Sequence, residues 1–258
     1  MKFIKSFINK LPQGWQERIR KWHYARKLRS ATLEDEAELG VVELLVKPGQ
    51  TVLDIGANFG LFTRFLSEAV GAKGHVFSFE PTNDMFAVLE HNIQALNFAN
   101  VTASKLALSD AAGRSTIYIP RRADGTLNHY EASVELLEGM GDIVEDEIEQ
   151  ITLDQFCKAR GIEAVDFIKC DVEGHELAVL AGGKNFFTSC RPPILLEVNE
   201  PLDDGGHGSQ VRELVEALGY TIHTCSGAKI VPWKAGEVRV NYLLLPPERA
   251  AELSRITA

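Results

Sequence analysis

The sequence feature that most constrains the fold is an apolar run that ends in a glycine-containing loop, Val52–Gly60 (VLDIGANFG). Its first residues are typical of a short buried strand, and Gly56 allows the backbone to turn sharply after that strand. Apolar residues at helical spacing follow directly, from Leu61 to Val70. A strand, a glycine turn and a helix in this order begin a βαβ unit, which predicts a parallel sheet covered by helices.

The alternation of strand and helix continues along the chain, which predicts an α/β fold with a doubly wound, mostly parallel sheet. We expect further strands in four apolar segments, at residues 75–80, 101–108, 165–170 and 193–198. We expect helices at residues 33–45, 83–96, 151–160, 177–187 and 210–218. Two final strands, at residues 220–225 and 240–245, would pair at the edge of the sheet.

The middle of the chain is less regular. Residues 115–119 suit a strand, and the polar residues 121–140 are typical of a loop or insertion over the site. The run at residues 145–149 is acidic, so we interpret it as a solvated stretch. The least patterned parts, residues 121–150 and 201–238, are where we expect contacts with a second substrate.

The charge of the chain is distributed unevenly along its length. Residues 1–30 carry nine basic side chains and one acid, a net charge of +8, whereas the other 228 residues carry −17. Apolar residues at helical spacing on either side of Pro12 predict one or two basic amphipathic helices. This extension, residues 1–31, either contacts a membrane surface or a partner protein, or packs on the core with its charges solvated. Residues 32–258 are expected to form one domain, whose acidic charge disfavours binding to nucleic acid.

Cysteine usage and hydropathy indicate a cytoplasmic protein. The four cysteines are scattered and form no CxxC pair, so neither a zinc knuckle nor a redox pair is indicated and a reducing compartment fits best. No segment approaches the ~18 consecutive apolar residues of a membrane span. The N-terminus lacks the apolar core and the cleavage site of a secretory signal. A peripheral position at the inner membrane surface is the alternative if the basic extension binds lipid.

Acidic residues lie at the ends of three of the expected strands. Asp54 lies at the end of the first strand, Glu80 closes the next one 26 residues later, and Asp171 directly follows the strand at 165–170. Because parallel strands end at one edge of a sheet, we expect these carboxylates around one hollow of nucleoside size. Glu80 would accept both hydroxyls of a ribose there. A solvated acid at a strand end is the alternative interpretation.

The loop after the first strand lacks the GxGxxG pattern of dinucleotide sites, so a nucleoside cofactor without phosphates fits it better. Asp54 is an acceptor suited to an ammonium group or a bridging water. Asn58 and Thr63 would bind a carboxylate near the N-terminus of the helix, where free N–H groups and the helix dipole favour an anion. A plain strand–turn–helix corner is the alternative.

The segment Asp171–Glu176 (DVEGHE) places three carboxylates and an imidazole within six residues, which is costly unless charge or a metal ion balances them. We interpret Asp171 as lying near the reacting end of the cofactor, and Glu173 or His175 as facing the acceptor; helix capping is the alternative. Asp171, Glu173 and Glu197 also offer oxygen ligands suited to Mg²⁺ or Ca²⁺. Their spacing alone does not show that they converge, so we expect no metal ion.

These motifs together resemble the FkbM family of methyltransferases over roughly residues 35–200. The first block is shared by many methyltransferases, whereas DVEGHE followed by VLAG is the more discriminating pair. Residues 1–30 and 201–258 lie outside the match. The matching stretches, in chain order, are 52–60 (VLDIGANFG), 79–81 (FEP), 107–110 (ALSD) with Gly113, 152–154 (TLD), 168–176 (IKCDVEGHE), 179–182 (VLAG) and 194–197 (ILLE).

The resemblance implies a Rossmann-like, seven-stranded sheet of the class I methyltransferase type, with S-adenosylmethionine as cofactor. It implies O-methylation of a hydroxyl on a sugar, glycan or natural product. The cofactor-binding residues that it implies are Asp54, Gly56, Ala57, Asn58, Gly60 and Thr63 at the methionine end, Glu80 with Pro81 at the ribose, Ala107 and Leu108 at the adenine, and Asp171.

The candidate catalytic residues are His175, Glu173 and Asp171. A hydroxyl acceptor must lose its proton, and His175 or Glu173 would act as the base that removes it. The resemblance also implies that Ser109 or Asp110 lies near the adenine amino group. No metal ligand is assigned.

Other functional classes stay open on the sequence alone. A nucleotide-dependent oxidoreductase would use a similar strand–glycine–helix corner, although the absent GxGxxG pattern counts against it. A non-catalytic cofactor-binding module would use the basic extension for docking. A nucleic-acid methyltransferase is disfavoured by the acidic body and by the absence of an NPPY-type motif.

Overall fold

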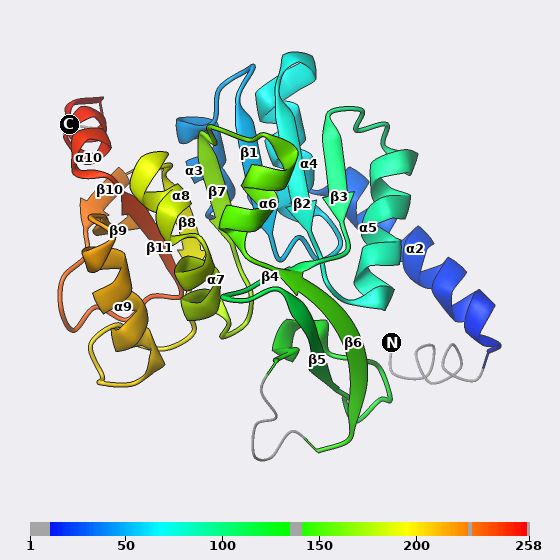
Figure 1. The fold of residues 1–258 in the computed structure, drawn as a ribbon. Helices are drawn as coiled ribbons and strands as arrows, with labels where there is room; N and C mark the ends of the chain where they lie inside the picture. The colour runs from blue at the N-terminus through cyan, green and yellow to red at the C-terminus, as the bar shows by residue number, and fades with distance from the viewer. Residues whose placement is uncertain (1–10, 135–140, 227–228, 257–258) are drawn as a thin grey trace.

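The computed structural model describes residues 11–134, 141–226 and 229–256 and has an eight-stranded sheet at its centre (Figure 1). The strands are Thr51–Ile55 (β1), His75–Phe79 (β2), Val101–Ser104 (β3), Phe167–Cys170 (β7), Ile194–Glu197 (β8), Thr221–Ser226 (β9), Lys229–Pro232 (β10) and Asn241–Leu245 (β11). Their order across the sheet is β10-β9-β11-β8-β7-β1-β2-β3. Five neighbouring strands, β8, β7, β1, β2 and β3, run parallel to one another. The remaining three, β11, β9 and β10, each pair antiparallel with their neighbours.

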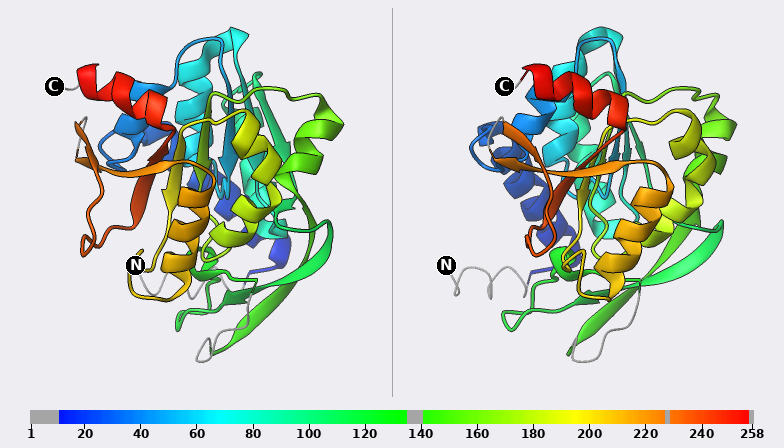
Figure 2. Two further views of the ribbon diagram at one scale, coloured as in Figure 1. Left: turned by 60° about the vertical axis from the view of Figure 1, so that its left-hand side comes forward. Right: turned by 90° about the vertical axis from the view of Figure 1, so that its left-hand side faces the viewer.

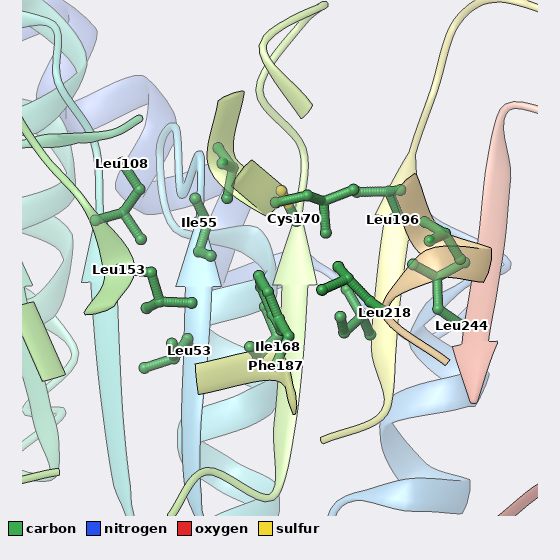
Figure 3. Packing of buried hydrophobic residues seen from close by; sticks show 14 of the residues in the cluster. Leu53, Ile55, Leu108, Leu153, Ile168, Cys170, Phe187, Leu196, Leu218 and Leu244 are labelled. Atoms are coloured by element: carbon green, nitrogen blue, oxygen red, sulfur yellow. The ribbon is translucent and has the colours of Figure 1, made fainter. Parts of the chain in front are cut away.

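Helices cover both faces of this sheet (Figures 1 and 2). They are Leu39–Leu45 (α3), Leu61–Val70 (α4), Asn83–Ala95 (α5), Leu153–Arg160 (α6), Glu176–Gly182 (α7), Lys184–Ser189 (α8), His207–Ala217 (α9) and Pro247–Ile256 (α10). Alternate strand residues point to opposite faces. Leu53 and Ile168 pack with α6 to α9 (Figure 3), whereas Val52 and Phe167 pack with α3 and α4. The expected α/β class and doubly wound, mostly parallel sheet are confirmed.

The helix α2 (Gln13–Ser30) packs on α5 beside the parallel half of the sheet (Figure 1). Leu28 is buried in a cluster with Phe59, and the ring of Tyr24 stacks on Phe59 with 4.9 Å between ring centroids. Trp15 and Trp22 are 59% and 61% exposed, so this helix packs on the core by one side and presents two tryptophans to solvent. The first helix expected in this extension falls on residues 1–10, outside the described residues. No helix in the described ranges has both the length and the apolar character needed to cross a membrane.

A second sheet of three strands lies beside the main one; its strands, in spatial order, are Ala107–Leu108 (β4), Ile143–Ile151 (β6) and Gly113–Pro120 (β5). It extends away from the main sheet in each view (Figures 1 and 2). The solvated stretch expected at residues 145–149 belongs to a strand, β6. The glutamates of this run are exposed, whereas Ile148 is buried in a cluster with Ile117. The three glutamates therefore occupy one face of a strand, and Asp146 between them conceals the alternation.

Two expectations about strands are corrected by the pairing. Residues 101–108 do not form one strand, because β3 ends at Ser104 and pairs with β2, while β4 pairs with β6 of the second sheet. The strands expected at 220–225 and 240–245 do pair antiparallel, as β9 and β11. The edge beyond them is β10, so the main sheet has eight strands rather than seven.

Two expected helices differ from the prediction. The helix expected at 33–45 begins at Leu39, because Asp35 accepts hydrogen bonds from the backbone N–H and the hydroxyl of Thr32 and thereby closes a turn. The helix expected at 177–187 is divided at Gly183 into α7 and α8.

Gly182→Ala tests the contact between α7 and the end of β4. A Cβ at Gly182 would lie 1.9 Å from the carbonyl oxygen of Ser109, so the backbone must shift to admit it. We expect the free energy of unfolding, measured by urea denaturation, to fall by about 1–3 kcal/mol. Gly40→Ala in α3 is the matched control, because no atom lies within 4 Å of its Cβ position, and it should be neutral or stabilising. Equal losses in both variants would contradict this packing.

Candidate active site

A cavity of about 420 Å³ opens where the parallel strands end, and its volume lies within the range of small-molecule sites. Asp54 at the end of β1, Glu80 after β2 and Asp171 after β7 all line it. The second sheet completes the wall together with Lys27 of α2 and the segment before α3. The three strand-end carboxylates therefore share one hollow, as the parallel arrangement predicts.

The loop after β1 is held against the neighbouring strand ends. The backbone N–H groups of Gly56 and Ala57 donate to the carbonyl of Phe79, at 3.0 and 2.8 Å. Gly56 has a φ of +81°, and a Cβ there would lie 1.7 Å from the carbonyl oxygen of Asp171. Only glycine allows this conformation and this approach. Gly56, Ala57 and Asn58 consequently form a continuous part of the cavity wall.

Glu80 is buried, with 6% of its surface exposed, and backbone groups orient its carboxylate. Its Oε2 accepts from the N–H of Asn58 at 3.0 Å, and its Oε1 accepts from the N–H and the hydroxyl of Thr82 at 3.0 and 2.6 Å. Burial raises the pKa of Glu80 above its ordinary value, although these hydrogen bonds lower it. A carboxylate offers about four acceptor sites. One site on Oε2 is therefore still available to a ligand.

Asn58 carries an acceptor that the protein does not use. Its φ of +50° is a conformation that asparagine tolerates, and its Oδ1 is buried with no hydrogen-bond partner. Buried polar atoms in folded proteins are nearly always hydrogen-bonded. Since Asn58 lines the cavity, this oxygen fits a ligand that brings an N–H or O–H donor.

Thr63 and Gly60 lie behind the wall rather than on it. Thr63 is fully buried, and its hydroxyl donates to Oδ2 of Asp54 at 2.5 Å and lies 3.0 Å from the hydroxyl of Ser78. Gly60 precedes α4 with a φ of +94°, and a Cβ there would lie 2.9 Å from Cδ1 of Leu89. Burial raises the pKa of Asp54 to about 6, against the opposing effects of Thr63 and nearby Lys169. In this arrangement Thr63 orients Asp54, which itself lines the cavity.

An apolar section of the wall comes from the second sheet. Ala107 and Leu108 of β4 line the cavity together with side chains from β5, β6 and the segment that follows β5: Ile117, Ala132, Val134 and Ile148. Pro81 lines the same cavity. Ser109 does not line it, and its hydroxyl instead lies 2.9 Å from Nε2 of His175. His175 is thereby held towards the end of β4.

The opposite section of the wall is charged. Lys169 of β7 is 2% exposed, and its Nζ lies 3.5 Å from Oδ2 of Asp171 and 3.7 Å from Oε2 of Glu197. Carboxylate oxygens of Asp171, Glu173 and Glu197 all lie within 4.8 Å of one another. The convergence that the sequence spacing does not reveal is therefore present in the structure. Asn199 fixes Glu173 by donating from Nδ2 to Oε2 at 3.1 Å.

Burial and mutual repulsion perturb this charged section. Burial, followed by the charges of Asp171 and Glu197, raises the pKa of Glu173 to about 8. Burial and Asp171 likewise raise the pKa of Glu197 to about 7. Burial alone would lower the pKa of Lys169, but the attraction of Asp171 and Glu197 outweighs it, so the pKa is raised and the ammonium stays charged. Glu173 thus faces other carboxylates, whereas His175, two residues later, is hydrogen-bonded to Ser109.

Sequence reasoning overlooks several residues of the wall. Lys169 gives a detectable signal, because a lysine inside an apolar strand is rarely buried without a charged partner. The others give no local signal, since they come from the segment before α3, from α4, and from the start of β11 and the residue before it: Glu36, Glu38, Phe62, Val240 and Asn241. Of the expected acceptor-facing segments, residues 121–150 contribute to the wall, whereas no described residue of 201–238 does.

Comparison with known proteins gives consistent matches. The family model described as Methyltransferase FkbM domain matches residues 54–222. The chain is 30% identical over 185 residues to the 2-O-methyltransferase NoeI of Sinorhizobium fredii, covering 68% of this chain and 74% of that protein. It is 32% identical over 204 residues to the 31-O-demethyl-FK506 methyltransferase FkbM of Streptomyces tacrolimicus, covering 69% and 75%.

Among solved structures, a methyltransferase FkbM from Methylobacillus flagellatus aligns with a TM-score of 0.47 at 14% identity, covering 88% of this chain and 59% of that one. The alternatives of a nucleotide-dependent oxidoreductase and of a non-catalytic module are not favoured. The family match spans the glycine loop, Glu80, and the charged section of the cavity. The chain belongs to the FkbM family of methyltransferases, and S-adenosylmethionine is its cofactor.

Proposed function

We propose that the protein transfers the methyl group of S-adenosylmethionine to a hydroxyl of a small-molecule acceptor, such as a sugar, a glycan or another natural product. The observation that carries the proposal is a single cavity that joins the buried carboxylate of Glu80 to the charged groups around Lys169. Relatives whose names specify O-methylation support oxygen as the methylated atom.

In this proposal the cofactor lies along the ends of β1, β2 and β4. Glu80 would accept one ribose hydroxyl on Oε2, and the second would share Oε1 with the hydroxyl of Thr82. Apolar side chains of the second sheet, including Ile117 and Ile148, would enclose the adenine ring. Oδ1 of Asn58 would accept a hydrogen bond from the ammonium group at the methionine end.

The acceptor would then lie at the charged section of the wall. The cofactor supplies a methyl carbon on a cationic sulfur, and the protein positions the acceptor oxygen and removes its proton. We assign the proton to the carboxylate of Glu173. The O–H bond breaks as the O–CH₃ bond forms, and the electron pair of the broken S–CH₃ bond stays on sulfur. His175 is the weaker candidate because its Nε2 is hydrogen-bonded to Ser109, near the proposed adenine site.

Glu80→Gln tests the ribose contact. Glutamine keeps the size of the side chain but exchanges a carboxylate oxygen for a group that cannot accept a hydrogen bond. We expect affinity for S-adenosylhomocysteine, measured by titration calorimetry, to fall about tenfold or more, which corresponds to the ~1.5–3 kcal/mol of a hydrogen bond to a charged group. Glu147→Gln, at an exposed position of β6, is the control and should bind as the native protein does. Unchanged affinity in Glu80→Gln would contradict the assignment.

Methyl transfer to a panel of methyl glycosides and hydroxylated natural products, followed with radiolabelled S-adenosylmethionine, tests the function itself. We expect the native protein to label at least one compound. Glu173→Gln should lose about a hundredfold or more in turnover, the typical contribution of a general base, whereas His175→Ala should keep most of it. Both variants should bind S-adenosylhomocysteine normally. Bound cofactor without transfer to any compound would favour a binding module.

The rate should also depend on pH through Glu173. Only the ionised carboxylate accepts a proton, and its pKa is raised to about 8. The rate should therefore rise as the pH increases towards about 8 and level above it. A flat profile over this range in the native protein would remove Glu173 as the base.

We also propose that residues 1–31 are an extension of the domain that follows, and that the outer side of α2 contacts an anionic membrane surface. Trp15 and Trp22 are seven residues apart and so share one side of the helix. The guanidinium groups of Arg18 and Arg26 lie 6.0 and 5.7 Å from the centroids of these two rings. Indole and guanidinium groups side by side suit the head-group region of a bilayer.

Cosedimentation with vesicles tests this contact. The native protein should bind vesicles that contain phosphatidylglycerol and not vesicles of phosphatidylcholine alone, because the contact needs both charge and indole. Trp15→Ser combined with Trp22→Ser should reduce binding severalfold. Equal binding of the two proteins would mean that α2 has no such role.

A further inference from the structure

Four polar side chains form two register pairs near the edge of the main sheet. Asp54 is the register partner of Lys169 between β1 and β7, and Glu197 is the register partner of Asn241 between β8 and β11. The residues two positions along these strands belong to the apolar cluster under α3 and α4. Since side chains two apart on a strand share a face, these four side chains lie on that face. All four residues line the cavity.

Two of these four residues carry buried polar atoms without hydrogen-bond partners. Nζ of Lys169 has none, because the oxygens of Asp171 and Glu197 lie at 3.5 and 3.7 Å, beyond good hydrogen-bond distance. The ring of Phe62, with its centroid 5.1 Å from Nζ, covers another side of the ammonium. Oδ1 of Asn241 is also buried and unpartnered. A compound with several hydroxyls can satisfy both atoms, since one hydroxyl can accept from the ammonium and another can donate to the oxygen of Asn241.

The carboxylates around Lys169 also require a cation. Oxygens of Asp171, Glu173 and Glu197 lie within 4.8 Å of one another, a spacing that would suit a divalent metal ion. The Lys169 ammonium already pairs with two of the three. A fixed ammonium and a divalent cation at this place would repel each other, so they are alternatives for the same role.

We propose that Lys169 binds the acceptor oxygen and serves as the fixed cation of the carboxylate cluster in place of a divalent metal ion. The ammonium donates a hydrogen bond to the oxygen and so directs the hydroxyl hydrogen towards Glu173. This inference rests on the proposed function, because the oxygen in question is that of the acceptor hydroxyl.

The charges around Lys169 also define the class of acceptor. Glu36 and Glu38 line the same cavity, and the charge of Lys169 acts on Glu36 while that of Glu38 acts on Glu197. The two lysines that line the cavity, Lys27 and Lys169, therefore face an excess of carboxylates. Carboxylates accept hydrogen bonds from hydroxyls and repel anions. The acceptor is accordingly a neutral polyhydroxyl compound rather than one that carries a carboxylate or phosphate.

Binding of Mn²⁺ tests the role of Lys169 without an acceptor or cofactor. It is measured as the decrease in the electron-paramagnetic-resonance signal of free Mn²⁺. The native protein should show no saturable binding in the millimolar range. Lys169→Met should bind one Mn²⁺ at least tenfold more tightly than the native protein does, and adding Glu173→Gln should abolish the gain. Lys158→Met, at an exposed position of α6, is the matched control and should behave as the native protein.

Two results would overturn the proposal. One is saturable Mn²⁺ binding by the native protein that Glu173→Gln removes. The other is a Lys169→Met variant that has a native circular dichroism spectrum and gains no Mn²⁺ affinity. Lys169→Gln replaces the methionine variant if the latter does not fold.

A second measurement needs only the native protein. It should methylate neutral methyl glycosides at the same rate with and without a chelator, and leave the corresponding glucuronides unmethylated. A requirement for added Mg²⁺ or Mn²⁺, or a preference for the glucuronide, would overturn the proposal. Failure to bind S-adenosylhomocysteine would instead refute the proposed function, and calorimetry with that compound separates the two cases.

Discussion

The close approach of two backbones, at Gly56 and at Asp171, is the constraint on which the site depends. The absence of a Cβ at Gly56 lets the loop after β1 lie against the carbonyl of Asp171, whose N–H donates back to Ile55 at 3.0 Å. On its other side the loop donates to the carbonyl of Phe79. Three neighbouring strand ends are thereby tied together. Their carboxylates line one cavity because the backbones meet there, not because the side chains attract one another.

Charge compensation is the second organising feature of the cavity. Burial makes ionised carboxylates costly, as the raised pKa values of Glu80, Glu173 and Glu197 indicate. At one section backbone N–H groups orient and stabilise Glu80; at the other the ammonium of Lys169 supplies positive charge. A nucleoside that carries a cationic sulfur suits a cavity with buried carboxylates at both of its sections. The structure thus joins a section that binds through hydrogen bonds to a section that acts through charge.

Much of the fold and part of the site follow from local sequence patterns. The glycine loop, Glu80 and Asp171 are predictable because each directly follows an apolar strand, and parallel strands share an edge. The second sheet is not, since the acidic run at residues 145–149 conceals its alternation. Asn241 enters the site through register across neighbouring strands, which no local pattern encodes, whereas Lys169 is signalled only as a lysine inside an apolar strand. The side chain of Thr63, in the first turn of α4, is buried and donates to Asp54. It therefore lies behind Asp54 and not on the cavity wall.

A crystal structure of the protein with S-adenosylhomocysteine would test the central claim most directly. The claim is that the strand ends of β1, β2 and β7 form one nucleoside site whose reacting end faces Lys169 and Glu173. The account predicts ribose hydroxyls within hydrogen-bond distance of the Glu80 carboxylate and a sulfur atom directed towards Glu173. A nucleoside bound outside this cavity, or a ribose held by Asp171 and Glu197 with its sulfur directed towards β4, would contradict it.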